Sequence, residues 1–288
     1  IGCSFAQGSF SPPIPRGKTV IHATNDPADL DRHVEADLAI VGDARIVLRQ
    51  LIEAVHALLS SGHVRASRDA FHSAIEEARQ KGVADRHDQN TASTLPINPY
   101  RVISEVMRAV NPDETIVTHD SGNPRDQLLP NWVSTSPRGY LGWGKSTQLG
   151  TGLGIIMGAK LAHPEKLCIN FMGDLAFGTA AIELETAVRE RIGTLTILLN
   201  NSVMGGYTAY MPTASSMYRS NRLSGDYTTV ARGLGAHAER VEQPGDLAGA
   251  IARALQSTLG GRPALIEAIT KEEPVFLRAR DAVLGAPH

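Results

Sequence analysis

Asp174 and Asn201 are the two side chains whose types and spacing most clearly suggest a chemical role. Asp174 follows the apolar run 167–172, and Asn201 follows the next apolar run, 194–199. Their separation of 27 residues (201 − 174) accommodates a turn, a helix and a second strand, which predicts a strand–helix–strand crossover. Both side chains would then emerge at the carboxyl edge of a parallel sheet, where ligands of open α/β sheets bind.

Carboxylate and carboxamide oxygens at that edge are hard ligands suited to Mg²⁺, which usually binds together with phosphate groups of a substrate or cofactor. A helix expected to begin near Gly178 would add free backbone N–H groups that attract phosphate. Taken alone, the Gly173-Asp174 pair is more often a turn with a helix cap, and Asn200-Asn201 is more often a loop. Because the two pairs occur together at the ends of neighbouring strands, we favour a metal-bridged diphosphate site.

The elements that would position this site alternate between strands and helices from residue 99 onward. Apolar runs predict strands at 115–118, 167–172, 194–199 and 264–268, and helical spacing predicts helices at 101–110 and about 179–190. Alternation of this kind predicts an α/β fold in which helices cover both faces of a parallel sheet.

The first third of the chain is organised differently. Two expected strands and an amphipathic helix lie at 19–23, 38–41 and 44–59. They are typical of the C-terminal part of a Rossmann-like domain, which we place at 1–62. Residues 63–98 combine a charged helix at 65–81 with a polar stretch rich in turn residues, which is typical of a linker. The ligand-binding domain is then expected at 99–288.

The composition restricts the partners and the compartment. The 288 residues carry 28 Lys and Arg against 30 Asp and Glu, a formal charge of −2, so no basic surface for nucleic acid or an anionic membrane is expected. No apolar run is long enough to span a bilayer. Two cysteines, Cys3 and Cys168, cannot form a disulfide framework, so we expect a reducing, cytoplasmic location. The start at Ile1 lacks the basic region of a signal peptide, and a chain without an initiator Met could be part of a longer one.

The Gly-Asp pair at 173–174 and the Asn-Asn pair at 200–201 together resemble the fingerprint of the thiamine diphosphate-dependent enzymes. Further similarity to acetolactate synthase relatives is found at 40–44, 95–100 and 150–162. The resemblance covers nearly the whole chain. It implies the C-terminal portion of such an enzyme, with a thiamine diphosphate-binding α/β domain preceded by part of a Rossmann-like middle domain.

The resemblance assigns metal and phosphate roles residue by residue. It implies that the side chains of Asp174 and Asn201 bind Mg²⁺ and that the main-chain carbonyl of Val203 is a third ligand. It also implies that Leu175 and Ala176 donate backbone N–H groups to the diphosphate. Leu175 departs from the family, which usually has Gly, Ser or Ala there, although a backbone donor survives the change.

Other segments are implied to contact the cofactor as well. Gly122 and Asn123 match the family's second phosphate-contacting loop, and Gly173 belongs to the first. Leu149 lies where the family has a large apolar side chain beneath the cofactor, which bends the cofactor so that its pyrimidine nitrogen faces thiazolium C2. The main chain of Thr147 and Leu149 would pair with the pyrimidine edge.

Several other side chains are weaker candidates, because a packed or solvated role is at least as common for each. His119 and Asp120 could contact the cofactor or substrate from a loop. Residues that could shape a substrate pocket or meet an anionic substrate are Tyr207, Tyr210, Tyr218, Arg219, Lys145 and Arg125. Glu183 and Glu185, on a covering helix, are more often structural.

A partner is also implied. In the family, a glutamate from an N-terminal pyrimidine-binding module activates the cofactor, and we find no such module in this sequence. We therefore expect this chain to supply the metal and diphosphate half of the site and to need a partner chain or a missing segment, in an oligomer such as a dimer or tetramer. The prediction is that the chain alone does not turn over a 2-oxo acid.

Three functions remain open. The first is a thiamine diphosphate- and Mg²⁺-dependent C–C lyase or ligase that acts on 2-oxo acids, as in acetolactate synthase. The second keeps the cofactor but acts on a 2-hydroxyacyl-CoA or oxalyl-CoA, because the run 173–178 with Glu183 and Glu185 is especially similar to those enzymes. The third is a non-catalytic cofactor-binding module. Contact with FAD or ADP through the partial middle domain receives little weight.

Overall fold

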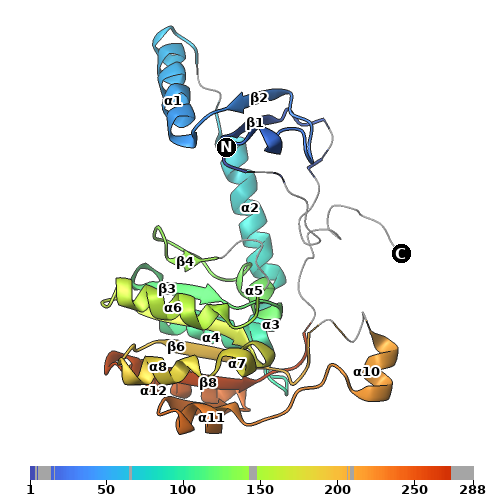
Figure 1. The fold of residues 1–288 in the computed structure, drawn as a ribbon, viewed down its shortest axis with the longest axis vertical. Coiled ribbons are helices and arrows are strands. Elements are labelled where there is room, and N and C mark those ends of the chain that lie inside the picture. The colour runs from blue at the N-terminus through green and yellow to red at the C-terminus, as the bar shows by residue number, and fades with distance from the viewer. Residues whose placement is uncertain are drawn as a thin grey trace. The chain divides into compact units, whose positions relative to one another are not determined.

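A computed structural model describes residues 1–3, 5, 14–15, 17–64, 67–142, 148–205, 207 and 211–273. The described chain divides into two compact units, one ending at Glu77 and the other beginning at Ala78. Figure 1 shows the elements of each unit. Within the described residues, no helix combines the length and the apolar character that crossing a membrane requires.

The second unit is built on a parallel sheet of six strands in the order β4-β3-β5-β6-β8-β7. The strands are β3 (Thr115–His119), β4 (Tyr140–Leu141), β5 (Leu167–Gly173), β6 (Leu195–Asn200), β7 (His237–Val241) and β8 (Ala264–Ile269). The parallel α/β fold and the four strands expected from apolar runs are confirmed. The two edge strands, β4 and β7, were not predicted.

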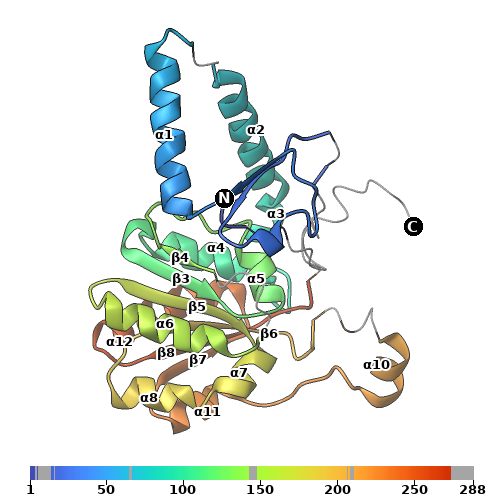
Figure 2. The ribbon, with the colours of Figure 1, turned by 45° about the horizontal axis from the view of Figure 1, so that its top comes forward.

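Helices cover both faces of this sheet (Figures 1 and 2). The helices packed against one face are α4 (Pro99–Ala109) and α12 (Leu247–Leu259). Those packed against the other face are α6 (Thr151–Ala162), α7 (Asp174–Ala180), α8 (Glu183–Arg189) and α11 (Tyr227–Gly233). The remaining helices of this unit are α3 (His87–Asn90), α5 (Asn123–Leu128) and α10 (Pro212–Tyr218), with 3₁₀ turns at Pro112–Glu114 and Pro244–Asp246.

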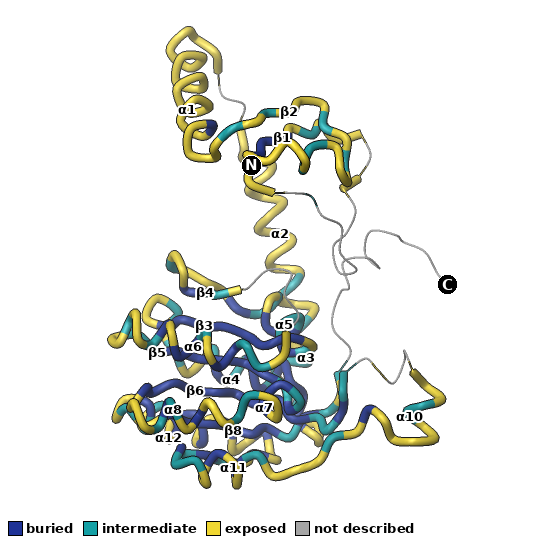
Figure 3. Tube along the Cα trace, in the orientation of Figure 1, coloured by how far each residue is buried: buried dark blue, intermediate teal, exposed yellow. Residues whose placement is uncertain are grey.

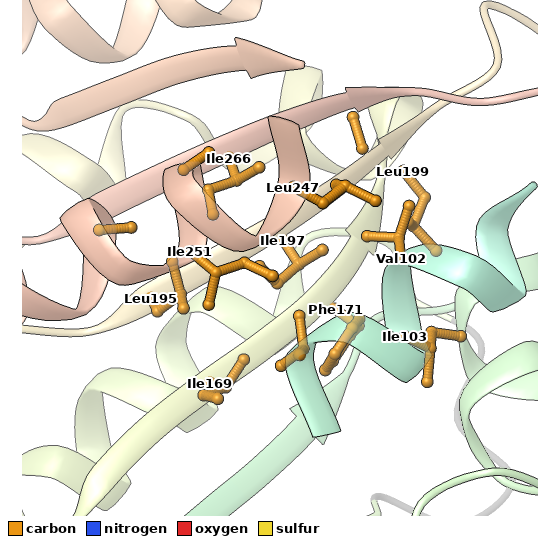
Figure 4. Close-up of a cluster of buried hydrophobic side chains, with 14 of the residues drawn as sticks. Val102, Ile103, Ile169, Phe171, Leu195, Ile197, Leu199, Leu247, Ile251 and Ile266 are labelled. Carbon is orange, nitrogen blue, oxygen red and sulfur yellow. The ribbon is translucent and has the colours of Figure 1, made fainter. Parts of the chain in front are cut away.

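Alternation along the central strands divides the core between the two faces. Leu195, Ile197 and Leu199 of β6 pack into the cluster beneath α4 and α12, whereas Leu198 joins the cluster beneath α7, α8 and α11. Figure 4 shows side chains of the sheet, Phe171 among them, facing those of α4 and α12. Burial on both faces explains why these strands appear in the sequence as continuous apolar runs.

The first unit contains a two-stranded parallel sheet of β1 (Ile21–Thr24) and β2 (Leu38–Val41), a 3₁₀ turn at Pro27–Asp29, and α1 (Ala44–Ser60). The two strands and α1 fall close to the ranges predicted from the sequence, and the 3₁₀ turn was not predicted. The side chains of α1 are exposed, apart from Val47 (Figure 3).

The helix expected at 65–81 is α2 (Asp69–Asp85), which runs across the division between the two units. It extends four residues further than predicted, and α3 follows it, so part of the polar stretch expected as a linker is helical. Asn98, at the end of this stretch, caps α4, because its side chain accepts a hydrogen bond from the N–H of Tyr100 at 3.0 Å.

Candidate functional site

Three neighbouring strands end at the same edge of the sheet. β5 lies between β3 and β6, and the register places His119 beside Phe171 and Gly173 beside Leu199. Because all three strands are parallel, the segments that follow them leave the sheet side by side. The carboxyl edge therefore carries the loops that contain Gly122, Asp174 and Asn201, as the sequence predicted.

Asp174 connects two of these loops. Its carboxylate is buried, with 3% of the residue exposed. Oδ1 accepts a hydrogen bond from the N–H of Leu175 at 2.8 Å, and Oδ2 accepts one from the N–H of Ser202 at 2.7 Å. The end of β5 is thus joined to the turn that follows β6.

The helix after β5 begins at Asp174 itself, so the expectation of a start near Gly178 is wrong. Gly173 is extended and serves as the N-cap of α7, and Gly178 lies inside that helix. Strand β5 ends at Gly173 and α7 starts at the next residue, so no loop separates them, and the Asp174 carboxylate accepts the N–H of Leu175 in the first turn of the helix.

The electrostatics of Asp174 suit a cation. Burial raises the pKa of its carboxyl to about 6, an effect opposed by the N–H groups of Leu175 and Ser202 and reinforced by the negative charge of Glu267. A carboxylate held in this environment without a positive partner is costly, and a bound cation would lower that cost.

The turn after β6, whose Ser202 N–H donates to this carboxylate, contains the Asn201 amide and the Val203 carbonyl. Asn201 Oδ1 accepts a hydrogen bond from the N–H of Val203 at 3.0 Å, which fixes the turn, and Ser202 has a left-handed backbone with φ of 56°. Val203 is buried, and its backbone forms an isolated antiparallel β-bridge with that of Arg222. The structure therefore brings Asp174, Asn201 and Val203 to one place in the fold.

This set of donors fits a magnesium ion bound together with a diphosphate. Among the residues that the structure describes, no group of three or more His, Cys, Asp and Glu side chains could hold a metal ion. One carboxylate, one amide and one carbonyl leave about three of six octahedral positions for phosphate oxygens and water, which is how Mg²⁺ is usually held.

The second expected phosphate loop lies against this edge. Gly122 has φ of 90°, a conformation that glycine adopts freely, and Asn123 begins α5. A Cβ atom on Gly205 would lie 2.3 Å from Asn123 Nδ2, and one on Gly173 would lie 3.8 Å from Pro124 Cγ. The loops after β3, β5 and β6 are thus in contact.

Asp120 positions the start of α6. It is fully buried, and its Oδ1 accepts hydrogen bonds from the N–H of Ser121 at 2.8 Å and of Gly150 at 3.0 Å. Its Oδ2 accepts one from the N–H of Gly152 at 2.9 Å. Because Gly150 and Gly152 belong to the N-terminus of α6, the carboxylate fixes the turn that contains Leu149.

Leu149 precedes the N-cap Gly150, and 36% of its surface is exposed, so it is available for a contact beyond the chain's own core. Thr147, Lys145 and Tyr210 lie outside the described residues.

The weaker candidates that the structure describes are exposed or have contacts of their own. Burial lowers the pKa of His119, whose Nδ1 lies 3.1 Å from the carbonyl oxygen of Asp120. Arg125 forms an ion pair with Asp126 at 2.7 Å. The remaining described candidates are exposed or engaged on their own helix: Glu183, Glu185 with Arg189, Tyr207, Tyr218 and Arg219.

One polar residue that sequence reasoning did not select, Glu267, contributes to this edge through Asn200 of the Asn-Asn pair. Glu267 is fully buried in β8, and its Oε1 accepts a hydrogen bond from Asn200 Nδ2 at 2.7 Å. In the sequence, Glu267 could have been recognised as the single acidic residue inside the otherwise apolar strand 264–269. A carboxylate at such a position is rarely buried without partners.

Comparison with known families agrees with this geometry. Residues 120–268, slightly more than half of the chain, match the sequence profile described as "Thiamine pyrophosphate enzyme, C-terminal TPP binding domain". The matched region begins at Asp120 and ends in β8, so it contains all three loops of the candidate site. The chain belongs to the thiamine pyrophosphate enzyme family.

Individual relatives point to the same family. The chain is 27% identical to a probable acetolactate synthase large subunit of Methanocaldococcus jannaschii, over 96% of this chain and 45% of that protein. It is 27% identical to the large subunit of acetolactate synthase isozyme 3 of Escherichia coli, over 86% of this chain and 43% of that protein. It is 26% identical to a 2-hydroxyacyl-CoA lyase of Oryza sativa, over 81% of this chain and 41% of that protein. The chain therefore spans less than half the length of these relatives.

Proposed function

We propose that this chain supplies the metal- and diphosphate-binding half of a thiamine diphosphate- and Mg²⁺-dependent C–C lyase or ligase that acts on 2-oxo acids, as acetolactate synthase does. The observation that carries the proposal is the hydrogen bond from Ser202 to Asp174, which joins the two loops that contain the metal ligands. Similarity to acetolactate synthases over most of the chain supports the choice of substrate class.

Each group at the edge has a distinct task in this proposal. Asp174, Asn201 and the carbonyl of Val203 hold Mg²⁺. Backbone N–H groups of Leu175 and Ala176 bind the diphosphate. The metal neutralises charge on the diphosphate, and the buried Asp174 carboxylate keeps the metal at one position.

The remaining contacts orient the cofactor. Gly122 and Asn123 contact the diphosphate from the loop after β3, and Gly173 contributes to the diphosphate site from the end of β5. Leu149 supports the cofactor from the turn before α6, and the main chain of Thr147 and Leu149 pairs with the pyrimidine edge. When bound, thiamine diphosphate supplies the electron sink that C–C cleavage requires.

A second module completes the site. An N-terminal pyrimidine-binding module, on another chain or another segment, would provide the glutamate that activates the cofactor, within a dimer or tetramer. The relatives are more than twice as long as the part of them that this chain matches, which is consistent with such a module. A cytoplasmic location belongs to the same proposal.

Titration calorimetry with thiamine diphosphate, with and without Mg²⁺, tests the proposal. We expect binding that requires Mg²⁺ and is lost in Asn201→Ala, and turnover of pyruvate only after a pyrimidine-binding module is added. Binding that is indifferent to Mg²⁺ would refute the metal site. Turnover by the chain alone would refute the need for a second module.

A second candidate function is an enzyme that acts on 2-hydroxyacyl-CoA or oxalyl-CoA. The similarity to the 2-hydroxyacyl-CoA lyase of Oryza sativa favours it, together with the run 173–178 followed by Glu183 and Glu185. Parallel assays with pyruvate and a 2-hydroxyacyl-CoA distinguish the two substrates. Mg²⁺-dependent binding without turnover of either substrate, even with the second module, would instead indicate a non-catalytic cofactor-binding module.

A further inference from the structure

Glu267 is a buried acidic residue that the proposed ligand set does not use. It lies in β8, and none of its surface is exposed. Its neighbours Ile266 and Ala268 pack into the core beneath α4 and α12, so Glu267 faces the opposite side, toward α11. A buried carboxylate is stable only when hydrogen-bond donors satisfy it.

Two donors from different elements converge on this carboxylate. Asn200 Nδ2, at the end of β6, donates to Oε1 at 2.7 Å, and the N–H of Thr228, in the first turn of α11, donates to Oε2 at 3.3 Å. Arg240 on β7 brings its Nη1 to 3.8 Å from Oε1. Glu267 is thus linked to both the end of β6 and the start of α11.

The hydrogen bond from Asn200 sets the orientation of its amide. With Nδ2 facing Glu267, Asn200 Oδ1 accepts from the N–H of Ser202 at 2.9 Å and from its hydroxyl at 3.1 Å. The same Ser202 N–H also donates to Asp174 Oδ2 at 2.7 Å. A chain of hydrogen bonds therefore leads from β8, through β6, to the end of β5.

We propose that Glu267 is a positioning residue for the metal-binding turn at 200–203. Its carboxylate orients the Asn200 amide, which in turn holds Ser202, the residue between the proposed ligands Asn201 and Val203. The inference rests on the proposed function, since the turn is a metal site only under that proposal.

The chemistry of the contact requires a carboxylate. Two N–H donors, from Asn200 and Thr228, meet its two oxygens, and only a group with two acceptors satisfies both. Glu267→Gln keeps the volume but turns an NH₂ group toward one donor. One buried donor then loses its partner, and the turn loosens while the surrounding core is unchanged.

Hydrogen–deuterium exchange of the chain without metal or cofactor tests the inference directly. In Glu267→Gln we expect the N–H of Ser202 to exchange about tenfold faster, while the N–H groups of β3 and β5 exchange as before. Glu239→Gln is the matched control, because it removes a carboxylate from the neighbouring strand β7 that does not contact the turn. Its Ser202 exchange should equal that of the wild type.

A double variant reverses the polarity of the contact. In Asn200→Asp combined with Glu267→Gln, the new carboxylate accepts from the glutamine amide and from Ser202, and the glutamine oxygen accepts from Thr228. Slow exchange at Ser202 should return in the double variant. Unchanged exchange in Glu267→Gln, or no recovery in the double variant, would overturn the inference. If Glu267→Gln does not fold, the double variant alone tests the inference. Slow exchange of the Ser202 N–H would then support the inference, and fast exchange would overturn it.

A second measurement links the turn to the metal. Titration with Mg²⁺ and thiamine diphosphate should show roughly 10- to 100-fold weaker metal-dependent binding in Glu267→Gln and recovery in the double variant. Because exchange is measured without ligand, it is independent of the proposed function. Absence of binding in the wild type would count against the metal site, whereas equal exchange would count against the role of Glu267.

Discussion

The Asp174 carboxylate and the Ser202 backbone N–H are joined by a 2.7 Å hydrogen bond between the ends of two neighbouring strands. Each group belongs to the segment that directly follows its own strand. The hydrogen bond between them fixes the distance between the two segments. The loops that contain Asp174 and Asn201 are therefore held together before any ion binds, which reduces the ordering that ion binding requires.

Asp174→Asn should distinguish a role of this residue in the proposed metal site from a role in the stability of the fold. The amide keeps the volume but carries no charge, so we expect metal-dependent binding of thiamine diphosphate to weaken by more than about 100-fold in calorimetry. One of the two N–H donors, from Leu175 or Ser202, loses its acceptor, which costs about 1 kcal/mol, but removal of the buried charge offsets this loss, so we expect no large net destabilisation in urea unfolding. Asp85→Asn, at an exposed position of α2, is the control and should bind normally. Retained Mg²⁺-dependent affinity in Asp174→Asn would contradict the assignment.

Gly205→Ala should act on the second phosphate loop. The added Cβ would lie 2.3 Å from Asn123 Nδ2, so the asparagine side chain must move. We expect about tenfold weaker binding of thiamine diphosphate, with little change in stability because the displaced group is a side chain rather than backbone. Gly245→Ala, where no atom lies within 4 Å of the added Cβ, should leave the affinity unchanged. Equal affinities of the two variants would show that Asn123 does not contact the cofactor.

A pair of glycines in α6 tests the contact of this helix with Asp120. In Gly152→Ala, the added Cβ would lie 2.5 Å from Asn170 Oδ1 and 3.0 Å from Asp120 Oδ2, both in the buried interior. We expect a loss of about 2 kcal/mol in urea unfolding. Gly154→Ala, in the same helix with open space around it, should instead gain up to about 1 kcal/mol from helix propensity. The opposite order of stabilities would refute close packing at position 152.

The central part of the fold could be predicted because burial on both faces leaves a clear pattern in the sequence. All six residues of β6 are buried, and its apolar run has almost the length of the strand. β7 could not be recognised in the same way, because its five residues include His237, Glu239 and Arg240 at the edge of the sheet. The two residues of β4 are too few to form a pattern.

The location of the proposed ligands at the edge of the sheet could be predicted for a similar reason, since a residue that directly follows a strand must lie there. The interactions that hold the proposed ligands in place could not be predicted from the sequence. Asn200 and Glu267 are 67 residues apart, and the contact between Asp120 and Gly152 joins residues 32 apart. Only the folded arrangement of the strands shows which polar residues meet.

The ion pair between Glu239 and Arg253 predicts a dependence of stability on pH. The hydrogen bond from Arg253 is the main reason that the pKa of Glu239 lies below its usual 4.5, with a smaller contribution from His237. Because the pKa is lower in the folded than in the unfolded chain, the stabilisation is fully present above 4.5 and is lost as the pH falls through the folded value. Arg253 is 60% exposed, so solvent screens the pair and its effect is small. Glu239→Gln should therefore lower the urea midpoint slightly at about pH 7, and the difference from the wild type should shrink as the pH falls below 4.5 toward about pH 3. A difference of equal size at both pH values would show that the side chain stabilises the fold by packing rather than by charge.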